Sequence, residues 1–275
     1  MDKIIGFIGS GNMGSAMVGG IVKADLTKPE NVFVASRNKN TLAHLKEEYK
    51  INAVKDNKSL AGCVDILILA VKPNGYKEVI EEIKNDCKEN CVIVSIAAGI
   101  SIEAIEEMFD KPIHLIRTMP NTPAFVGEAM SALCPNSLVT EKEIEEVKLI
   151  FNSFGRCEVV SESLIDAVIG VSGSSPAYVY MFIEALADAA VMGGMKREQA
   201  YQFVAQAVYG SAKMVLETGI HPGILKDNVC SPAGTTIEAV RELERQGFRS
   251  AIIEASKACM DKSKEMTKKG KGDGK

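Results

Sequence analysis

Three glycines near the start of the chain have the GxGxxG spacing that binds the pyrophosphate of a dinucleotide. Gly9, Gly11 and Gly14 follow an apolar run at residues 4–8. The apolar spacing of a helix begins near Asn12. A strand, a tight turn and a helix N-terminus then coincide, which directs backbone N–H groups and the positive end of a helix dipole at a phosphate. Glycine-rich turns without a ligand can have the same spacing. The prediction of a Rossmann dinucleotide-binding site therefore depends on the strand before the glycines and the helix after them.

The end of the second expected strand bears on which dinucleotide binds. An NAD enzyme usually ends this strand with Asp or Glu, which holds the ribose hydroxyls. Here the run at residues 31–36 ends with Ser36, and Arg37 follows. A hydroxyl and a guanidinium suit a 2′-phosphate, because charge-assisted hydrogen bonds of about 1.5–3 kcal/mol favour NADP(H) by roughly tenfold to a hundredfold. Exposed polar residues at a strand end are the plainer interpretation, and NAD(H) stays open as an alternative cofactor.

Two further segments lie at the carboxyl ends of expected strands, where doubly wound sheets bind their ligands. They contain the small or cationic residues Ala70, Val71, Lys72 and Pro73 in the first segment, and Ala97 and Ala98 in the second. Small side chains there let a nicotinamide ring approach the backbone, although a simple exit from a strand has the same composition. Lys72 is a candidate anion contact rather than a catalytic acid.

The chain offers few groups for acid–base catalysis. Its three histidines are His44, His114 and His221, and neither a Ser/His/Asp set nor a pair of carboxylates is evident from the spacing. His114 lies in an apolar run, where a histidine is more often structural than a proton donor. This composition favours a reaction that needs no strong general acid.

A turn in the second half of the chain leads into a helix that begins with hydroxyl side chains. Residues 227–236 read Asp-Asn-Val-Cys-Ser-Pro-Ala-Gly-Thr-Thr, which brings Thr235 and Thr236 to a helix N-terminus. Backbone N–H groups and hydroxyls in that position suit a small carboxylate. From these residues alone, a helix-capping loop without a ligand is an equally good interpretation.

Apolar runs alternate with helical patterns in the first half of the chain, which predicts a parallel sheet with crossover helices. The expected strands are residues 4–8, 31–36, 66–71, 91–96 and 114–117. After residue 141 helical spacing dominates, with one more short run at residues 157–160. We therefore predict an α/β protein with an N-terminal Rossmann domain over residues 1–162. An all-α C-terminal domain over residues 163–275 follows, for substrate binding and oligomerisation.

The helices expected in the second half have broad apolar faces that are rich in small residues. One stripe runs through residues 200–215, and Thr218 and Gly219 fit a C-cap at its end. Gly247 separates two more helices. One small helical domain has too few neighbours to cover these faces, so we predict a homo-oligomer built through this half. A well-covered monomeric bundle is the alternative.

Composition disfavours several other classes of protein. The 275 residues are 46% hydrophobic and 25% charged, as in ordinary globular proteins. A net charge of −4 argues against nucleic acid as a partner, because phosphate binding relies on clustered Lys and Arg. No apolar segment reaches the roughly 18 residues of a membrane span, and no signal peptide is evident, so we expect a cytoplasmic protein without membrane contact. The seven cysteines lack CxxC spacing and nearby histidines, which predicts free core thiols and no metal site.

Four segments resemble the pyrroline-5-carboxylate reductase family, and the resemblance covers nearly the whole chain. They are Gly-Phe-Ile-Gly-Ser-Gly-Asn-Met-Gly at residues 6–14, and residues 70–73, 173–178 and 227–236. The last segment looks like the family signature and is far more specific than GxGxxG. The resemblance implies hydride transfer from NAD(P)H to the cyclic imine 1-pyrroline-5-carboxylate, which yields L-proline in the final step of proline biosynthesis.

The resemblance also implies roles for individual residues. Family positions that contact the cofactor match Ile8, Gly9, Ser10, Gly11, Asn12, Met13, Ser36, Asn57, Ala70, Val71, Lys72 and Pro73, and Asn228 matches a position close to it. The substrate pocket matches Glu162, Thr235 and Thr236, and Ser174 in the segment 173–178 is placed with it. Family members form interlocked dimers through an all-α dimerisation domain, often joined into larger rings such as a pentamer of dimers.

Two positions depart from the family pattern. Where the family commonly has Gly-Ser-Gly-Pro, this chain has Ser175 in place of the second glycine, and where it commonly has Pro-Gly-Gly, this chain has Ala233. If either backbone needs a positive φ angle, the side chain costs on the order of 1–2 kcal/mol and reshapes the loop.

These observations lead to a mechanistic hypothesis and two alternatives. The nicotinamide is expected between the sheet edge and the helical domain, with the substrate carboxylate at Thr235 and Thr236. Solvent protonates the imine, and Thr236 is the catalytic residue that orients the ring. A β-hydroxyacid-type dehydrogenase is one alternative, but it needs a paired lysine that the helical half does not evidently supply. A non-catalytic NADP-binding regulatory protein is the other, and Ser175 and Ala233 motivate it.

Overall fold

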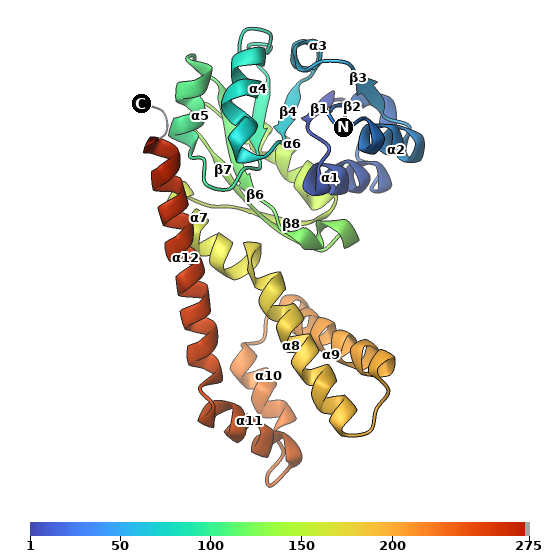
Figure 1. Ribbon diagram of the computed structural model, residues 1–275, viewed down its shortest axis with the longest axis vertical. Coiled ribbons are helices and arrows are strands. Elements are labelled where there is room, and N and C mark those ends of the chain that lie inside the picture. Colours follow the sequence, from blue (N-terminus) through green and yellow to red (C-terminus); the bar gives the residue numbers. More distant parts are fainter. Residues whose placement is uncertain (273–275) are drawn as a thin grey trace. The chain divides into compact units, whose positions relative to one another are not determined.

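The computed structural model describes the backbone of residues 1–272 and the side chains of residues 1–267. The chain divides into two compact units (Figure 1). The sheet unit comprises residues 1–174 together with the end of the chain from Cys259, and the helical unit comprises Ser175–Ala258. This division differs from the boundary expected after residue 162. Ile165 and Ile169 pack against Ala132 and Cys134 of the sheet, so the segment between residues 163 and 174 stays with it.

An eight-stranded sheet forms the centre of the sheet unit, in the order β3-β2-β1-β4-β5-β6-β7-β8 (Figure 1). Its strands are β1 (Ile5–Ile8), β2 (Val32–Ala35), β3 (Asn52–Val54), β4 (Ile66–Leu69), β5 (Val92–Ser95), β6 (His114–Met119), β7 (Ala129–Pro135) and β8 (Gly155–Val159). Every neighbouring pair is parallel except β6 with β7. The chain winds outward in both directions from β1 and β4, so ligands are expected at the carboxyl ends of these strands.

Helices cover both faces of this sheet (Figure 1). One face is covered by α1 (Asn12–Lys23), α2 (Lys39–Tyr49) and α6 (Glu141–Asn152), and the other by α3 (Asn57–Cys63), α4 (Tyr76–Ile83) and α5 (Ile102–Phe109). Within β4, Ile66 and Ile68 belong to the first core, whereas Leu67 and Leu69 belong to the second. Because both faces are buried, the central strands read as unbroken apolar runs rather than alternating ones.

All six expected strands are confirmed, each within two residues of its predicted ends. Two strands, β3 and β7, were not predicted. Because β7 runs antiparallel to β6, the sheet is mixed rather than wholly parallel as expected. After β8 the chain forms the short helix α7 (Ile165–Val168) and a π-helical turn (Ile169–Gly173) before it leaves the sheet unit.

The described part of the helical unit contains helices only. They are α8 (Ser175–Met192), α9 (Arg197–Thr218), α10 (Pro222–Val229), α11 (Thr235–Arg245) and the first part of α12 (Phe248–Gly272). Gly219 caps α9 with a φ of 64°, and Gly247, with a φ of 72°, separates α11 from α12, as predicted.

Apolar side chains of the helical unit are largely uncovered. Ala187, Ala200 and Val204 are its only buried hydrophobic residues, whereas Met181 and Phe203 are 69% and 68% exposed. A helical unit with so small a core needs another surface against which to pack. This agrees with the oligomer predicted through this half of the chain.

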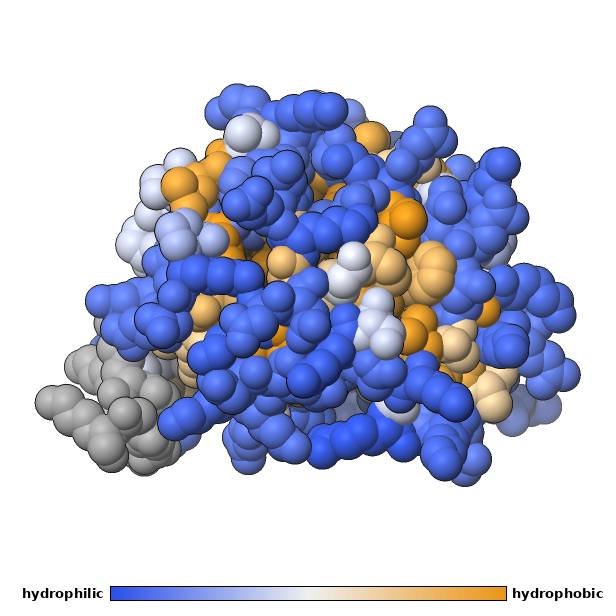
Figure 2. All heavy atoms as spheres, turned by 90° about the horizontal axis from the view of Figure 1, so that it is seen from above, coloured by the Kyte–Doolittle hydropathy of each residue, from blue (hydrophilic) through white to orange (hydrophobic). Residues whose placement is uncertain are grey.

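The face of the molecule drawn in Figure 2 is covered mainly by hydrophilic side chains, with smaller hydrophobic areas between them. In the described part of the chain, no helix combines the length and apolar character needed to cross a membrane.

Candidate functional site

The loop between β1 and α1 has the geometry that a dinucleotide pyrophosphate needs. Gly9 has a φ of 105°, and a Cβ added there would lie 2.6 Å from the carbonyl oxygen of Ala70. A Cβ on Gly14 would lie 2.7 Å from the Gly9 carbonyl oxygen, but one on Gly11 would meet no atom within 4 Å. Gly11 is also the N-cap of α1 and brings no side chain to its first N–H groups. The loop therefore closes tightly at two glycines and leaves open space at the third, which fits a bound pyrophosphate.

Four other predicted cofactor residues lie in this loop or beside it in the sequence. Ile8 and Ser10 are buried, Met13 is half-buried, and Asn12 is exposed as the first residue of α1. Asn57 begins α3, and its Nδ2 donates a hydrogen bond to Glu82 Oε2 at 2.7 Å. A cofactor contact at Asn57 therefore has to share this side chain with Glu82.

Ser36, at the end of β2, is hydrogen-bonded to the glycine loop. Ser10 Oγ donates to Ser36 Oγ at 2.6 Å, and Asn38 N donates to the same oxygen at 3.2 Å. Because Ser36 accepts both bonds, its own proton is left for another acceptor. Arg37 is exposed beside it. Residues 36–38 thus offer a hydroxyl proton and a guanidinium, and no carboxylate, to an incoming ribose phosphate.

The carboxyl ends of β4 and β5 are joined by a tyrosine that the sequence analysis did not single out. The Tyr76 hydroxyl donates to Leu69 O at 2.7 Å and lies 3.0 Å from Ser95 Oγ. Burial raises the pKa of Tyr76 to about 12, so the hydroxyl stays protonated. The predicted cofactor residues follow directly on these ends, with Ala97 buried, Ala70, Val71 and Ala98 half-buried, and Lys72 and Pro73 exposed.

Glu162 and Ser174, both predicted for the substrate, lie in the sheet unit and have protein partners. Glu162 Oε1 accepts from Ile102 N at 2.8 Å and from Arg117 Nη1 at 2.7 Å. Ser174 Oγ accepts from Cys259 Sγ at 3.1 Å. Arg117 was missed from the sequence, although a cation inside an apolar strand is itself a signal that a carboxylate must pair with it.

Thr235 and Thr236 begin α11 in the helical unit, as predicted. The N-cap of this helix is Gly234, and no side chain bonds to the first N–H groups. A Cβ on Gly234 would lie 2.3 Å from Ser231 Oγ and 3.0 Å from Ser231 O, so a side chain there would displace the Ser231 hydroxyl. Thr235 is exposed and Thr236 half-buried, while Asn228 is exposed in α10. The start of α11 therefore presents N–H groups and hydroxyls suited to a carboxylate.

Only one of the two departures from the family pattern falls on strained backbone. Ala233 has a φ of 57°, in the left-handed region, where a non-glycine residue costs about 1 kcal/mol. Ser175 begins α8 and is not among the residues with positive φ. The turn before Thr235 thus keeps a glycine-type backbone although its side chain is a methyl group.

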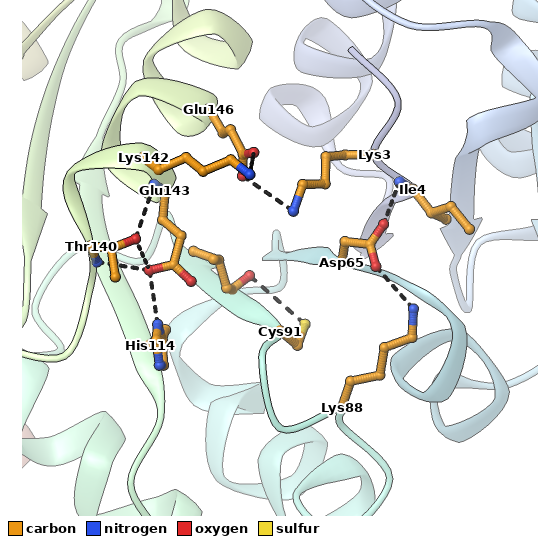
Figure 3. Close-up of polar contacts among 11 residues, drawn as sticks. Lys3, Ile4, Asp65, Lys88, Cys91, His114, Thr140, Lys142, Glu143 and Glu146 are labelled. Atoms are coloured by element: carbon orange, nitrogen blue, oxygen red, sulfur yellow. Dashed lines mark hydrogen bonds and ion pairs between the residues drawn. The ribbon is translucent and has the colours of Figure 1, made fainter.

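His114 has a structural role at the amino end of its strand, on the side of the sheet opposite the carboxyl ends of β4 and β5. It begins β6, and its Nδ1 lies 2.9 Å from Glu143 Oε2 (Figure 3). The same carboxylate oxygen accepts from Thr140 N at 2.7 Å and closes the capping box at the start of α6. His44 pairs with Glu48, and His221 caps α10, so the three histidines all have structural partners.

Glu143→Gln is expected to destabilise the protein near neutral pH by about 1 kcal/mol, the typical loss for a helix cap. Burial raises the pKa of Glu143, but hydrogen bonds from Thr140 and His114 outweigh it and leave the pKa below its usual value. Because the pKa of Glu143 is lower in the folded state, the ionised carboxylate stabilises the folded protein at pH values above the ordinary glutamate pKa of about 4.3. This stabilisation is lost as the pH falls through the folded-state pKa. Urea unfolding of both proteins at several pH values measures the difference. If the two proteins still differ by the same free energy of unfolding at about pH 2, the stabilisation does not come from the ionised Glu143 carboxylate.

The cysteines and the metal-ligand types give no sign of a metal centre in the described part of the chain. No group of three or more His, Cys, Asp or Glu residues is placed to hold an ion there. All seven cysteines are free, but only Cys91, Cys134 and Cys157 are buried. The expectation of free core thiols is thus confirmed for these three. Cys63, Cys87 and Cys259 are half-buried and pack against the cores, and only Cys230 is half-buried without packing against one.

Comparisons with known proteins agree with this geometry. A model of the pyrroline-5-carboxylate reductase dimerisation region matches residues 162–266. A model described as NADP oxidoreductase, coenzyme F420-dependent, matches residues 4–99. The chain is 51% identical to a pyrroline-5-carboxylate reductase of Escherichia coli K12, over 98% of this chain and 100% of the relative.

Two solved structures have the same fold over almost their whole length. A pyrroline-5-carboxylate reductase from Coxiella burnetii is 33% identical with a TM-score of 0.92, covering 97% of this chain and 99% of that one. A Plasmodium falciparum pyrroline carboxylate reductase with NADP bound is 36% identical with a TM-score of 0.86, covering 97% of this chain and 98% of that one. Sequence and fold therefore agree along the full chain, and the protein belongs to the pyrroline-5-carboxylate reductase family.

Proposed function

We propose that this chain reduces 1-pyrroline-5-carboxylate to L-proline with NADPH as the preferred hydride donor. The observation that carries the proposal is the start of α11, where Thr235 and Thr236 follow an N-cap without a side chain. This arrangement suits a small anionic substrate, and binding of a dinucleotide at the β1–α1 loop does not require it. The open position at Gly11 supports the cofactor half of the proposal.

The residues of this chain bind and orient rather than supply a strong acid. NADPH supplies the hydride that forms the new C–H bond at the imine carbon, while the C=N π electrons move onto nitrogen. The N–H groups at the start of α11 and the Thr235 hydroxyl bind the substrate carboxylate. Thr236 is the proposed catalytic residue, because its hydroxyl orients the ring by a hydrogen bond. Solvent protonates the imine nitrogen before transfer, so no histidine is required.

Glu162, Ser174 and Asn228 are further residues with proposed binding roles. Oε1 of Glu162 is engaged by Ile102 and Arg117, which leaves Oε2 for a protonated ring nitrogen. Ser174 accepts a bond from Cys259, so its own proton is available to the substrate. Asn228 is exposed in α10 and is proposed to contact the cofactor.

Arg37→Asp is expected to weaken NADPH binding by roughly tenfold to a hundredfold and to leave NADH binding nearly unchanged. The guanidinium is proposed to bind only the 2′-phosphate, which NADH lacks. Dissociation constants from cofactor fluorescence titrations measure both effects. Arg156→Asp makes the same charge change on β8, at the opposite edge of the sheet from β2, and serves as the matched control. Equal weakening of both cofactors in Arg37→Asp contradicts the 2′-phosphate role.

The activity is tested by mixing the purified protein with 1-pyrroline-5-carboxylate and following NADPH absorbance. Rapid oxidation with formation of proline supports the reductase, and its absence favours a regulatory NADP-binding protein. A panel of hydroxy acids with NADP⁺ tests the β-hydroxyacid-type dehydrogenase. Turnover of a hydroxy acid without turnover of the imine contradicts the proposal.

The quaternary structure is proposed to be an interlocked homodimer built through the helical unit. The exposed apolar faces of α8 and α9 support this assembly, because water is a poor partner for side chains such as Met181 and Phe203. The resemblance to the family extends the proposal to a pentamer of such dimers. Light scattering of the purified protein measures the mass directly.

A further inference from the structure

The π-helical turn Ile169–Gly173 stands directly before Ser174. Ser174 N donates to Ile169 O at 2.8 Å, so the hydrogen bond spans five residues instead of the four of an α-helix. Single wide turns of this kind are rare and are often found at functional sites. The turn passes into α8, whose second residue is Pro176.

The Ser172 carbonyl lies where the π-helical turn ends, just before α8 begins at Ser175. Pro176 stands in the first turn of α8, where backbone N–H groups have no partner within the helix, and it has no N–H to offer to a preceding carbonyl. Asn121 supplies a donor to Ser172, because its Nδ2 donates to Ser172 O at 3.0 Å. A side chain of the sheet unit thus holds the end of the turn.

Asn121 is itself held in one orientation. It is 8% exposed, and its Oδ1 accepts from Met130 N on β7 at 2.9 Å. A carbonyl on one side and an N–H on the other permit only one placement of the amide oxygen and nitrogen. Asn121 follows the end of β6 by two residues, and Met119 Cε at that end lies 3.4 Å from the position of a Cβ on Gly173. The carboxyl end of β6 therefore meets the π-helical turn at two points.

We propose that Asn121 is a positioning residue for the imine substrate. It acts through Ser172 to hold the π-helical turn open and so fixes the place of Ser174 beside the carboxyl edge of the sheet. The inference rests on the proposed function, in which Ser174 contacts the substrate. Asn121 itself touches neither the substrate nor the cofactor in this role.

Asn121→Asp keeps one of the two hydrogen bonds of this side chain and removes the other. The aspartate keeps an oxygen for Met130 N, but it turns a second oxygen toward the Ser172 carbonyl, where the two acceptors repel each other. We expect the KM for 1-pyrroline-5-carboxylate to rise roughly tenfold, because the Ser172 carbonyl loses the donor that holds the turn in place. The dissociation constant for NADPH should stay at the parent value. Steady-state kinetics and cofactor titration measure the two quantities in the full-length protein.

Asn136→Asp is the matched control for stability. Asn136 follows β7 near the start of β6, where its Nδ2 donates to Ile113 O at 2.9 Å and its Oδ1 accepts from Leu115 N at 3.2 Å. The same amide-to-carboxylate change therefore disturbs hydrogen bonds to the backbone near the amino end of β6, away from the π-helical turn. We expect this control to lower Tm and to leave the KM for the imine unchanged.

A second variant covers the case in which Asn121→Asp does not fold. Asn121→Ala removes the donor to Ser172 O without adding a charge. We expect the KM for the imine to rise as in Asn121→Asp, while the dissociation constant for NADPH stays at the parent value. A parent-like KM in folded Asn121→Ala contradicts the positioning role.

Failure of the positioning role of Asn121 and failure of the proposed reductase activity give different experimental results. A parent-like KM in folded Asn121→Asp, or an equal rise in Asn136→Asp, overturns the positioning role while the parent chain still reduces the imine. Failure of the parent chain to oxidise NADPH with 1-pyrroline-5-carboxylate overturns the proposed function, and the inference with it.

Discussion

Gly11→Val is expected to weaken NADPH binding by up to roughly a hundredfold in a protein that still folds. A Cβ at Gly11 meets no protein atom within 4 Å, and the backbone there is extended, with a φ of −70°. The side chain instead fills the space proposed for the pyrophosphate, and overpacking of such a contact costs up to about 3 kcal/mol, or roughly a hundredfold in affinity. Cofactor titration measures the affinity, and thermal unfolding measures the stability. The unfolding free energy should fall by no more than about 1 kcal/mol, the scale of a weakened N-cap.

Gly9→Val is the contrasting control in the same loop. Gly9 has a positive φ and closely approaches the backbone of Ala70, so a side chain there strains the protein itself. We expect a large loss of Tm for Gly9→Val and little loss for Gly11→Val. NADPH affinity at the parent level in folded Gly11→Val contradicts the placement of the pyrophosphate at α1.

Thr236→Ala is expected to lower kcat/KM for 1-pyrroline-5-carboxylate by roughly tenfold to a hundredfold, since a hydrogen bond to a charged group contributes about 1.5–3 kcal/mol. The half-buried Thr236 stands in the first turn of α11, where the hydroxyl and the N–H groups are proposed to hold the substrate. Steady-state kinetics with NADPH at saturation measure the effect. NADPH affinity should stay unchanged, because the proposed cofactor contact in this half of the chain is Asn228.

Two controls separate the Thr236 hydroxyl from stability. Thr236→Ser keeps the hydroxyl and should recover most of the activity. Thr218→Ala removes another threonine hydroxyl of the helical unit, one that donates to Met214 O at 2.6 Å at the end of α9. It should leave kcat/KM at the parent value. Kinetics of Thr236→Ala equal to those of the parent would sink the proposed substrate pocket.

The sequence predicted the parts of the fold that depend on hydrophobic burial over several residues. Strands such as β4 and β5 are buried on both faces, so their residues are nearly all Val, Ile or Leu. The strand β3 has only three residues, none of them fully buried, and is too short to show a period. The strand β7 reads Ala-Met-Ser-Ala-Leu-Cys-Pro, and lacks the β-branched and aromatic residues that mark strands. Its place is set by β6 and β8 on either side rather than by its own composition.

The candidate site could be predicted where the backbone or a local motif defines it. The glycines of the β1–α1 loop and the start of α11 are such features, since their neighbours in sequence are also their neighbours in space. Arg117 and Asn121 were missed because the partners Glu162 and Ser172 lie 45 and 51 residues further along the chain. Tyr76 was missed because its contact with Ser95, 19 residues away, forms only when β4 and β5 lie side by side.

The sheet unit is built from two separate stretches of the chain, and this affects how the protein can fold during synthesis. Its second stretch is the end of α12, where the buried Ser263 donates to Asp166 Oδ1 at 2.6 Å. The ribosome makes that stretch only after the whole helical unit, whereas domains usually fold as their residues emerge. The Rossmann strands can pair early, but α7 stays uncovered until the stretch that begins at Cys259 has been made. A premature stop after the helical unit therefore leaves the nucleotide-binding region incomplete, although every residue of its sheet has been made.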